Sequence, residues 1–131
     1  MMFNTASAYG GAGARYRNID MSSRLEGASP HRLVAMLFEE IFRAIETAQA
    51  ADRQGDRGKR AERQARALSI LHALEASLDF EKGGDIATSL SSIYREARRL
   101  ISVGARDAQP AMVEQARAML ADIAEAWESI G

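Results

Sequence analysis

Apolar residues recur every three or four positions along most of the chain, which is the spacing of one face of an α-helix. The pattern is clearest near the C-terminus, at Met112, Ala116, Leu120, Ile123 and Trp127. With their neighbours these residues occupy an arc of roughly 120°, at about 100° per residue, as in a helix that packs one face against a core. No stretch alternates apolar and polar residues for long enough to predict a strand. The sequence therefore predicts an all-α fold.

The glycines and the two prolines fall in short clusters that separate the periodic segments. Both residue types interrupt helices, because glycine is flexible and proline lacks a backbone N–H group. The uninterrupted segments, rich in strong helix formers, span residues 30–54, 59–82, 85–103 and 110–130. We expect an antiparallel four-helix bundle over residues 29–131, preceded by a short, mobile N-terminal cap segment at residues 1–28.

The first segment has the clearest start signal, with Ser29 as N-cap and Pro30 at the first helical position. Its apolar residues spread over roughly 180°, which is wider than a helix in one core needs. They are Leu33, Val34, Leu37, Phe38, Ile41, Phe42 and Ile45, with Met36 on the other side. One interpretation is that the helix lies centrally or is covered by the N-terminal segment. The other is an exposed groove that takes an amphipathic segment of a partner. Both hold if residues 1–26 cover the groove until a partner arrives.

Composition and charge narrow the function classes. The 131 residues include no cysteine, which excludes a disulfide scaffold and a thiolate metal site. The formal net charge of −1 argues against binding to a nucleic-acid backbone. No apolar run approaches the ~18 residues that cross a membrane, and no secretory signal precedes the first helix. We therefore expect a cytoplasmic protein without nucleic-acid partners or stable membrane insertion.

The histidines are the candidates for metal chemistry. His31 lies in the first turn of its helix, and His72 is followed by Glu75, a loose echo of the Glu-x-x-His motif of di-iron bundles. Such sites need two motifs and two further glutamates, so we expect both histidines to be structural. We predict no metal, no cofactor and no catalytic residue. The cations between residues 52 and 66 alternate with acids and lack aromatic neighbours, which is typical of a solvated face.

Two longer strings carry a family resemblance. Residues 28–38, ASPHRLVAMLF, resemble the opening motif of the FliS family of flagellar secretion chaperones. Residues 77–94, SLDFEKGGDIATSLSSIY, are similar to the junction before that family's third bundle helix. The resemblance runs from about Tyr16 to Ile130, with both strings in the family's order.

The sequence departs from the family at three positions inside the resemblance. Glu40 and Ile41 stand where the family usually has a Gly-Ala pair, and Ser89 replaces the usual Asn. Larger side chains at positions 40 and 41 keep a neighbouring backbone further away. The shape of a groove at that turn therefore differs from the family's pattern.

The resemblance implies a chaperone that binds the disordered C-terminal segment of newly made flagellin in the cytoplasm. Such a chaperone prevents premature polymerisation and helps to deliver flagellin to the flagellar type III export gate. We expect Tyr16 and Ile19 to belong to a cover over the binding surface. The candidate groove contacts are Leu33, Met36, Leu37, Ile86, Leu90, Ile93 and Tyr94. Gly83 and Gly84 are expected to form the turn between the second and third helices, with Asp85 as the N-cap of the third.

Two alternatives from other classes stay open at this point. One is a self-associating helical adaptor whose wide apolar helix is a homodimer interface, and the other is a metal- or cofactor-binding bundle. For the chaperone interpretation we expect a monomer or a weak dimer.

Overall fold

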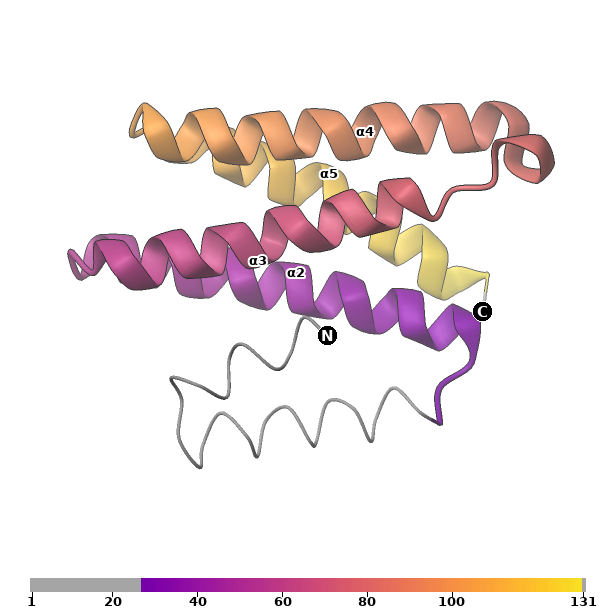
Figure 1. Cartoon of the computed structure of the whole chain (residues 1–131), viewed down its shortest axis with the longest axis horizontal. Coiled ribbons are helices and arrows are strands. Elements are labelled where there is room, and N and C mark those ends of the chain that lie inside the picture. The colour runs from indigo at the N-terminus through magenta and orange to yellow at the C-terminus, as the bar shows by residue number, and fades with distance from the viewer. Residues whose placement is uncertain (1–26, 131) are drawn as a thin grey trace. The chain divides into compact units, whose positions relative to one another are not determined.

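Four helices make up the described part of the chain, residues 27–130 of the computed structural model (Figure 1). They are α2 (Pro30–Arg53), α3 (Arg57–Ala76), α4 (Phe80–Arg106) and α5 (Pro110–Ser129). The predicted all-α fold with four helices is confirmed, and residues 27–130 contain no strand. Tyr16, Ile19 and most of the expected cap segment lie outside the described residues, so the boundary between residues 28 and 29 stays a prediction.

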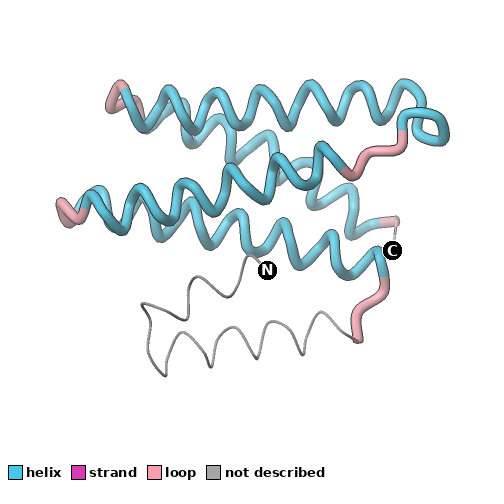
Figure 2. The backbone as a smooth tube through the Cα atoms, in the orientation of Figure 1, coloured by secondary structure: helices cyan, strands magenta, loops and turns pink. Residues whose placement is uncertain are grey.

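Residues 35–131 form one compact unit in which successive helices run in opposite directions (Figure 1). Short loops at residues 54–56, 77–79 and 107–109 join them (Figure 2). Helix α4 packs against both α3 and α5. Ion pairs attach α2 to its neighbours: Glu40 bonds to Arg66 of α3 at 3.3 Å, and Glu46 bonds to Arg117 of α5 at 3.0 Å.

The core of this unit draws large aliphatic side chains from every helix. Ile41 of α2, Leu71 of α3 and Leu120 of α5 are completely buried, and Leu100 of α4 is nearly so. Burial of each such side chain stabilises the fold by about 1.5–3 kcal/mol. The periodic apolar positions of the sequence therefore meet where the helical spacing predicts.

The start of α2 is built as its residues predict. The Ser29 hydroxyl accepts a hydrogen bond from the Arg32 N–H at 3.1 Å, and the Ser29 carbonyl accepts one from the Leu33 N–H at 2.8 Å. These bonds satisfy donors that a helix N-terminus leaves unpaired. Pro30 follows as the first helical residue, where no N–H is needed.

The turn between α3 and α4 comes earlier than predicted. Helix α3 ends at Ala76, and the Asp79 carboxylate caps the next helix by accepting from the Lys82 N–H at 3.0 Å. Asp85 comes directly after the break at Gly84, and its role as N-cap of the long helix stays a prediction. Gly84 still interrupts the helix, with φ +50° and ψ −126°, a conformation that glycine adopts without a Cβ clash. Gly84 therefore separates the short first turn of α4 from the long helix that follows it.

The turn between α4 and α5 uses a left-handed residue that is not glycine. Ala108 has φ +54°, and the Gln109 N–H donates to the Gly104 carbonyl at 2.8 Å, closing the end of α4. Helix α5 then begins at Pro110. Gly104 itself is buried, and a Cβ there would lie 2.9 Å from Val113 Cγ2 and 3.1 Å from the Gln109 carbonyl oxygen. The absence of a side chain at Gly104 lets α4 and α5 approach closely.

Candidate partner-binding surface

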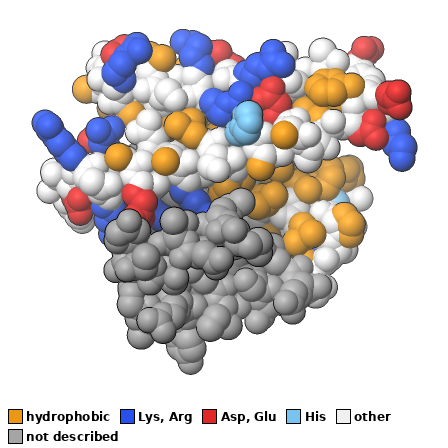
Figure 3. All heavy atoms as spheres, viewed as in Figure 1, with side chains coloured by type: hydrophobic (Ala, Val, Ile, Leu, Met, Phe, Trp, Pro, Cys, Tyr) orange, Lys and Arg blue, Asp and Glu red, His pale blue; other side chains and the backbone are white. Residues whose placement is uncertain are grey.

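Large apolar side chains are exposed where α4 begins. The exposed fraction is 52% for Phe80 and 72% for Ile86, and Leu78, just before the helix, is half-buried. Figure 3 shows hydrophobic and acidic side chains together at the right of the view, where α4 begins. Sequence analysis selected Ile86 but missed Phe80, which belongs to the first turn added by the Asp79 cap. Exposed apolar side chains that cluster in this way mark an interaction surface.

From this exposed end, an apolar stripe runs along α4 into the bundle. Ile86, Leu90 and Ile93 are spaced by four and three residues, so they share one face of the helix. Ile86 is exposed, Leu90 and Ile93 are half-buried, and Ala97, the next residue on this face, is completely buried. The structure therefore brings three of the predicted contact residues into one continuous strip.

Tyr94 and Met36 lie in the core instead. Tyr94 is 4% exposed, and burial raises the pKa of its hydroxyl above the ordinary value. Met36 of α2 is 6% exposed. A partner reaches these two side chains only if neighbouring groups move. Leu33 and Leu37, also of α2, are half-buried and keep part of their surface accessible.

Helix α2 is buried over far more of its circumference than one core face requires. Its eight buried positions, among them Ala35, Met36, Glu40 and Ile41, spread over roughly 260° at about 100° per residue. The wide apolar arc of the sequence therefore corresponds here to a helix that is buried around most of its circumference and has few exposed apolar side chains. Ala35 and Met36 fit the interpretation in which the arc is covered, because both are buried. Leu37 is partly exposed and fits the interpretation in which the arc forms an accessible groove.

Glu40 and Ile41, the positions that depart from the family pattern, are both part of the interior. Ile41 is completely buried, and Glu40 is 8% exposed. The Glu40 carboxylate is paired on both oxygens, with Arg43 at 2.7 Å and with Arg66 at 3.3 Å. A buried carboxylate is tolerated only with such partners. Glu40 therefore acts as a structural link between α2 and α3.

A second carboxylate, that of the partly buried Glu75, joins α3 to α4. It accepts hydrogen bonds from Arg95 Nε at 2.7 Å and from the Ser91 hydroxyl at 3.1 Å, and Arg98 pairs with its other oxygen at 2.5 Å. The hydrogen bonds from Arg95 and Arg98 lower the pKa of Glu75 from 4.5 to about 2. In the sequence, Glu75 was considered only as a possible metal ligand together with His72. In the structure, its carboxylate pairs with Arg95 and Arg98.

The described residues give no sign of other chemistry. Residues 27–130 hold no group of three or more His, Asp and Glu side chains placed to bind a metal ion. Within the same range, no helix combines the length and the apolar character needed to span a membrane. The cations of α3 are largely engaged in ion pairs: Arg60 with Asp52 at 3.5 Å, and Arg63 with Glu62 at 3.4 Å.

Comparison with known proteins assigns the chain to a family. The family model of the flagellar protein FliS matches residues 12–131, which include both strings and the whole described fold. The chain belongs to the FliS family. FliS proteins are chaperones and not enzymes, and the apolar strip is therefore a candidate for protein binding.

Individual members of the FliS family match most of the chain. The flagellar secretion chaperone FliS of Salmonella typhimurium is 40% identical over 118 residues, which cover 88% of this chain and 86% of that protein. The Vibrio cholerae protein of the same name is 31% identical over 115 residues, covering 88% and 85%. The Campylobacter jejuni protein is 30% identical over 102 residues, covering 78% and 80%. The similarity thus extends over all four helices.

Proposed function

We propose that this flagellar secretion chaperone binds the disordered C-terminal segment of flagellin in the cytoplasm, prevents its premature polymerisation and helps to deliver it to the type III export gate. Membership of the FliS family supports the flagellar part of this proposal. The observation that carries the binding role is the apolar strip of α4, which starts at an exposed isoleucine and enters the bundle.

The strip suits an amphipathic segment that folds on binding. A disordered segment loses conformational entropy when it becomes ordered, so it needs apolar contacts to offset that cost. Ile86 offers a side chain that is 72% exposed, and Leu90 and Ile93 offer partly accessible ones behind it. Leu33 and Leu37 of α2 are the remaining proposed contacts with accessible surface.

Calorimetry with two forms of flagellin tests the proposal. We expect a one-to-one complex with intact flagellin and no measurable binding to flagellin that lacks its C-terminal segment. The loss follows because the apolar face that meets the strip is on the deleted segment. Equal heats and equal affinities for the two forms would refute the proposed function.

The position of the surface is tested with two matched substitutions. Ile86 and Ile130 are 72% and 73% exposed, so replacing either one by serine removes a similar exposed apolar area and leaves the core intact. Complete burial of an isoleucine is worth about 1.5–3 kcal/mol, so the exposed part of Ile86 contributes about 1–2 kcal/mol. We expect Ile86→Ser to weaken flagellin binding about 5- to 30-fold and Ile130→Ser to leave it unchanged. The same loss in both variants would contradict the placement of the surface on α4.

A further inference from the structure

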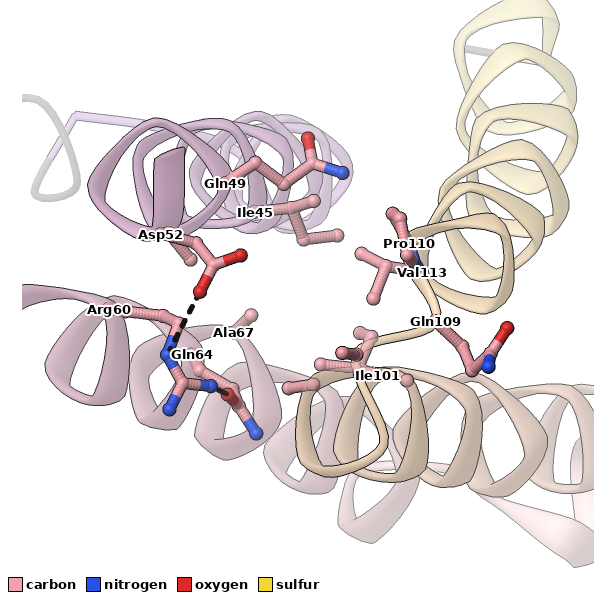
Figure 4. A pocket seen from close by; sticks show the side chains of 14 residues that line it. Ile45, Gln49, Asp52, Arg60, Gln64, Ala67, Ile101, Gln109, Pro110 and Val113 are labelled. Carbon is pink, nitrogen blue, oxygen red and sulfur yellow. Dashed lines mark hydrogen bonds and ion pairs between the residues drawn. The ribbon is translucent and has the colours of Figure 1, made fainter. Parts of the chain in front are cut away.

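A cavity of about 120 Å³ opens among all four helices, close to the point where α4 turns into α5 (Figure 4). Its apolar wall includes Ile45 of α2, Ala67 of α3, Ile101 of α4 and Val113 of α5. Figure 4 shows the side chains of Ile45, Ile101 and Val113 pointing toward one another across this space. The cavity shares no lining residue with the contacts proposed for flagellin.

Small residues create the space. Ala48, Ala67, Ala105 and Ala108 line it, together with Gly104. Gly104 cannot supply a filling side chain, because a Cβ there would come within 2.9 Å of Val113. Protein interiors are normally filled to the density of organic crystals, so an apolar gap of this size leaves contacts unmade. A group from outside the chain can make them.

The polar side chains around the cavity are bonded to one another. Arg60 pairs with Asp52 at 3.5 Å and donates to Gln64 at 3.5 Å, while the Gln49 amide donates to Glu114 at 3.0 Å. Asp52, Arg60 and Gln64 lie to one side of the cavity, and most of the remaining lining is apolar, including Ile45, Ile101 and Val113. A group entering the cavity therefore gains by being uncharged and apolar. An apolar protein cavity of about 150 Å³ holds benzene, so this one is matched to a group the size of one ring or one branched aliphatic side chain.

The exposed charged side chains beside the cavity indicate which residue types lie next to the inserted group on the partner. Asp52 lines the cavity and Glu114 accepts from the lining residue Gln49; their side chains are 71% and 54% exposed. The arginines that pair with them are more buried, at 28% for Arg60 and 42% for Arg117. Carboxylates therefore dominate the accessible rim on α2 and α5. An apolar pocket within a polar rim is the usual setting of a binding hot spot.

We propose that the cavity is a second docking site, which receives one aromatic or branched aliphatic side chain from an amphipathic helix of a partner protein other than flagellin. That helix carries a lysine or arginine next to the inserted side chain, to meet the exposed carboxylates. The site is distant from the apolar strip, since 18 residues separate Ile86 from Gly104 on α4, or about 27 Å at about 1.5 Å per residue. The two surfaces can be occupied at the same time.

Toluene, the free hydrocarbon analogue of the phenylalanine side chain, is the first probe. In methyl-resolved NMR of the full chain, we expect toluene to shift the signals of Ile45, Ile101 and Val113. Ala48→Leu places a side chain in the cavity and should weaken this binding at least tenfold. Ala73→Leu adds the same group to an exposed position outside the cavity and should not change it. The proposal is overturned if toluene leaves the wild-type signals unmoved or shifts Ala48→Leu equally. If Ala48→Leu does not fold, Ala105→Leu takes its place.

A pair of peptides tests whether the side chain that enters the cavity can come from an amphipathic helix. We would use a lysine-containing amphipathic helical peptide with a single phenylalanine on its apolar face, and its Phe-to-Ala counterpart. The phenylalanine peptide should bind the wild-type chain at least ten times more tightly than it binds Ala48→Leu, and at least ten times more tightly than the alanine peptide does. Binding of toluene without binding of either peptide would reassign the cavity to free small molecules and overturn the helix proposal.

Flagellin provides the last arm of the test. We expect Ala48→Leu to bind flagellin within twofold of the wild type, because the cavity and the strip are separate. A tenfold loss would mean that flagellin itself occupies the cavity, and the second-partner proposal would be wrong. This measurement changes the chaperone and keeps flagellin intact, whereas the truncation experiment changes flagellin and keeps the chaperone intact. Failure of the cavity proposal can therefore be distinguished from failure of the proposed function.

Discussion

Replacing Gly104 by alanine should destabilise the fold, although alanine is the better helix former. The added Cβ would lie 2.9 Å from Val113 Cγ2 and 3.1 Å from both the Gln109 carbonyl oxygen and Met112 Cβ. The Gln109 carbonyl oxygen and Met112 Cβ cannot rotate away, so α5 or the turn before it must shift. Such overpacking costs about 1–3 kcal/mol. The higher helix propensity of alanine offsets about 1 kcal/mol of this cost. Because the close contacts are with atoms that cannot rotate away, we expect the overpacking cost to lie near the upper end of its range. We expect a net loss of about 1–2 kcal/mol.

Urea denaturation followed by circular dichroism measures this loss, and Gly58→Ala is the matched control. Gly58 lies near the start of α3, and an added Cβ there would lie 3.9 Å from Asp56 Oδ1, an ordinary van der Waals contact, so the substitution meets no obstruction. The control should gain up to about 1 kcal/mol from reduced backbone entropy. For a domain of this size, the predicted loss at Gly104 lowers the melting temperature by about 4–8 °C. A Gly104→Ala variant as stable as Gly58→Ala would refute the close-approach argument.

Three further results are expected. Ala108→Gly should raise the unfolding free energy by about 0.5–1 kcal/mol, because Ala108 holds φ +54°, and an unchanged urea midpoint would contradict this. The pKa of Glu75 is lowered from 4.5 to about 2, so its stabilising contribution is complete above pH 4.5 and is lost as the pH falls toward 2. Glu75→Gln should therefore flatten the fall of stability with acid in that interval, and parallel titrations of variant and wild type would argue against the assigned pKa. Removal of residues 1–25 should tighten or accelerate flagellin binding in stopped-flow and calorimetric assays, whereas equal rates and affinities would leave the segment without a covering role.

The sequence predicted helix positions well where glycine or proline stands at the boundary. Helix α2 starts at Pro30 and α5 at Pro110, as expected, because proline suits the first helical position. The end of α3 was placed six residues late, at residue 82 instead of Ala76, because Ser77, Leu78 and Asp79 contain neither breaker. The signal that could have found the turn is Asp79 as an N-cap residue. Helix propensity alone does not separate two helices joined by three such residues.

The candidate surface was harder to predict because periodicity does not measure exposure. Ile86 and Tyr94 both belong to the apolar pattern of α4, yet the first is 72% exposed and the second 4%. Which apolar residue stays accessible depends on how far the neighbouring helices extend, and that is a property of the packed structure. The pairing of Glu75 with two arginines of α4 could not be predicted from the sequence for the same reason. These partners are 20 and 23 positions away in the chain and meet only when α3 and α4 pack.

The packing of α4 against both its predecessor and its successor has a consequence for the speed of folding. Helices joined by three-residue loops meet partners that are near in the chain, so little loop entropy is lost before contacts form. Helical bundles with such local topology fold in microseconds to milliseconds. A carrier of this kind is ready within a small fraction of the time that a ribosome needs to add one residue. If the chain binds newly made flagellin as proposed, its own folding is therefore too fast to limit the rate of capture.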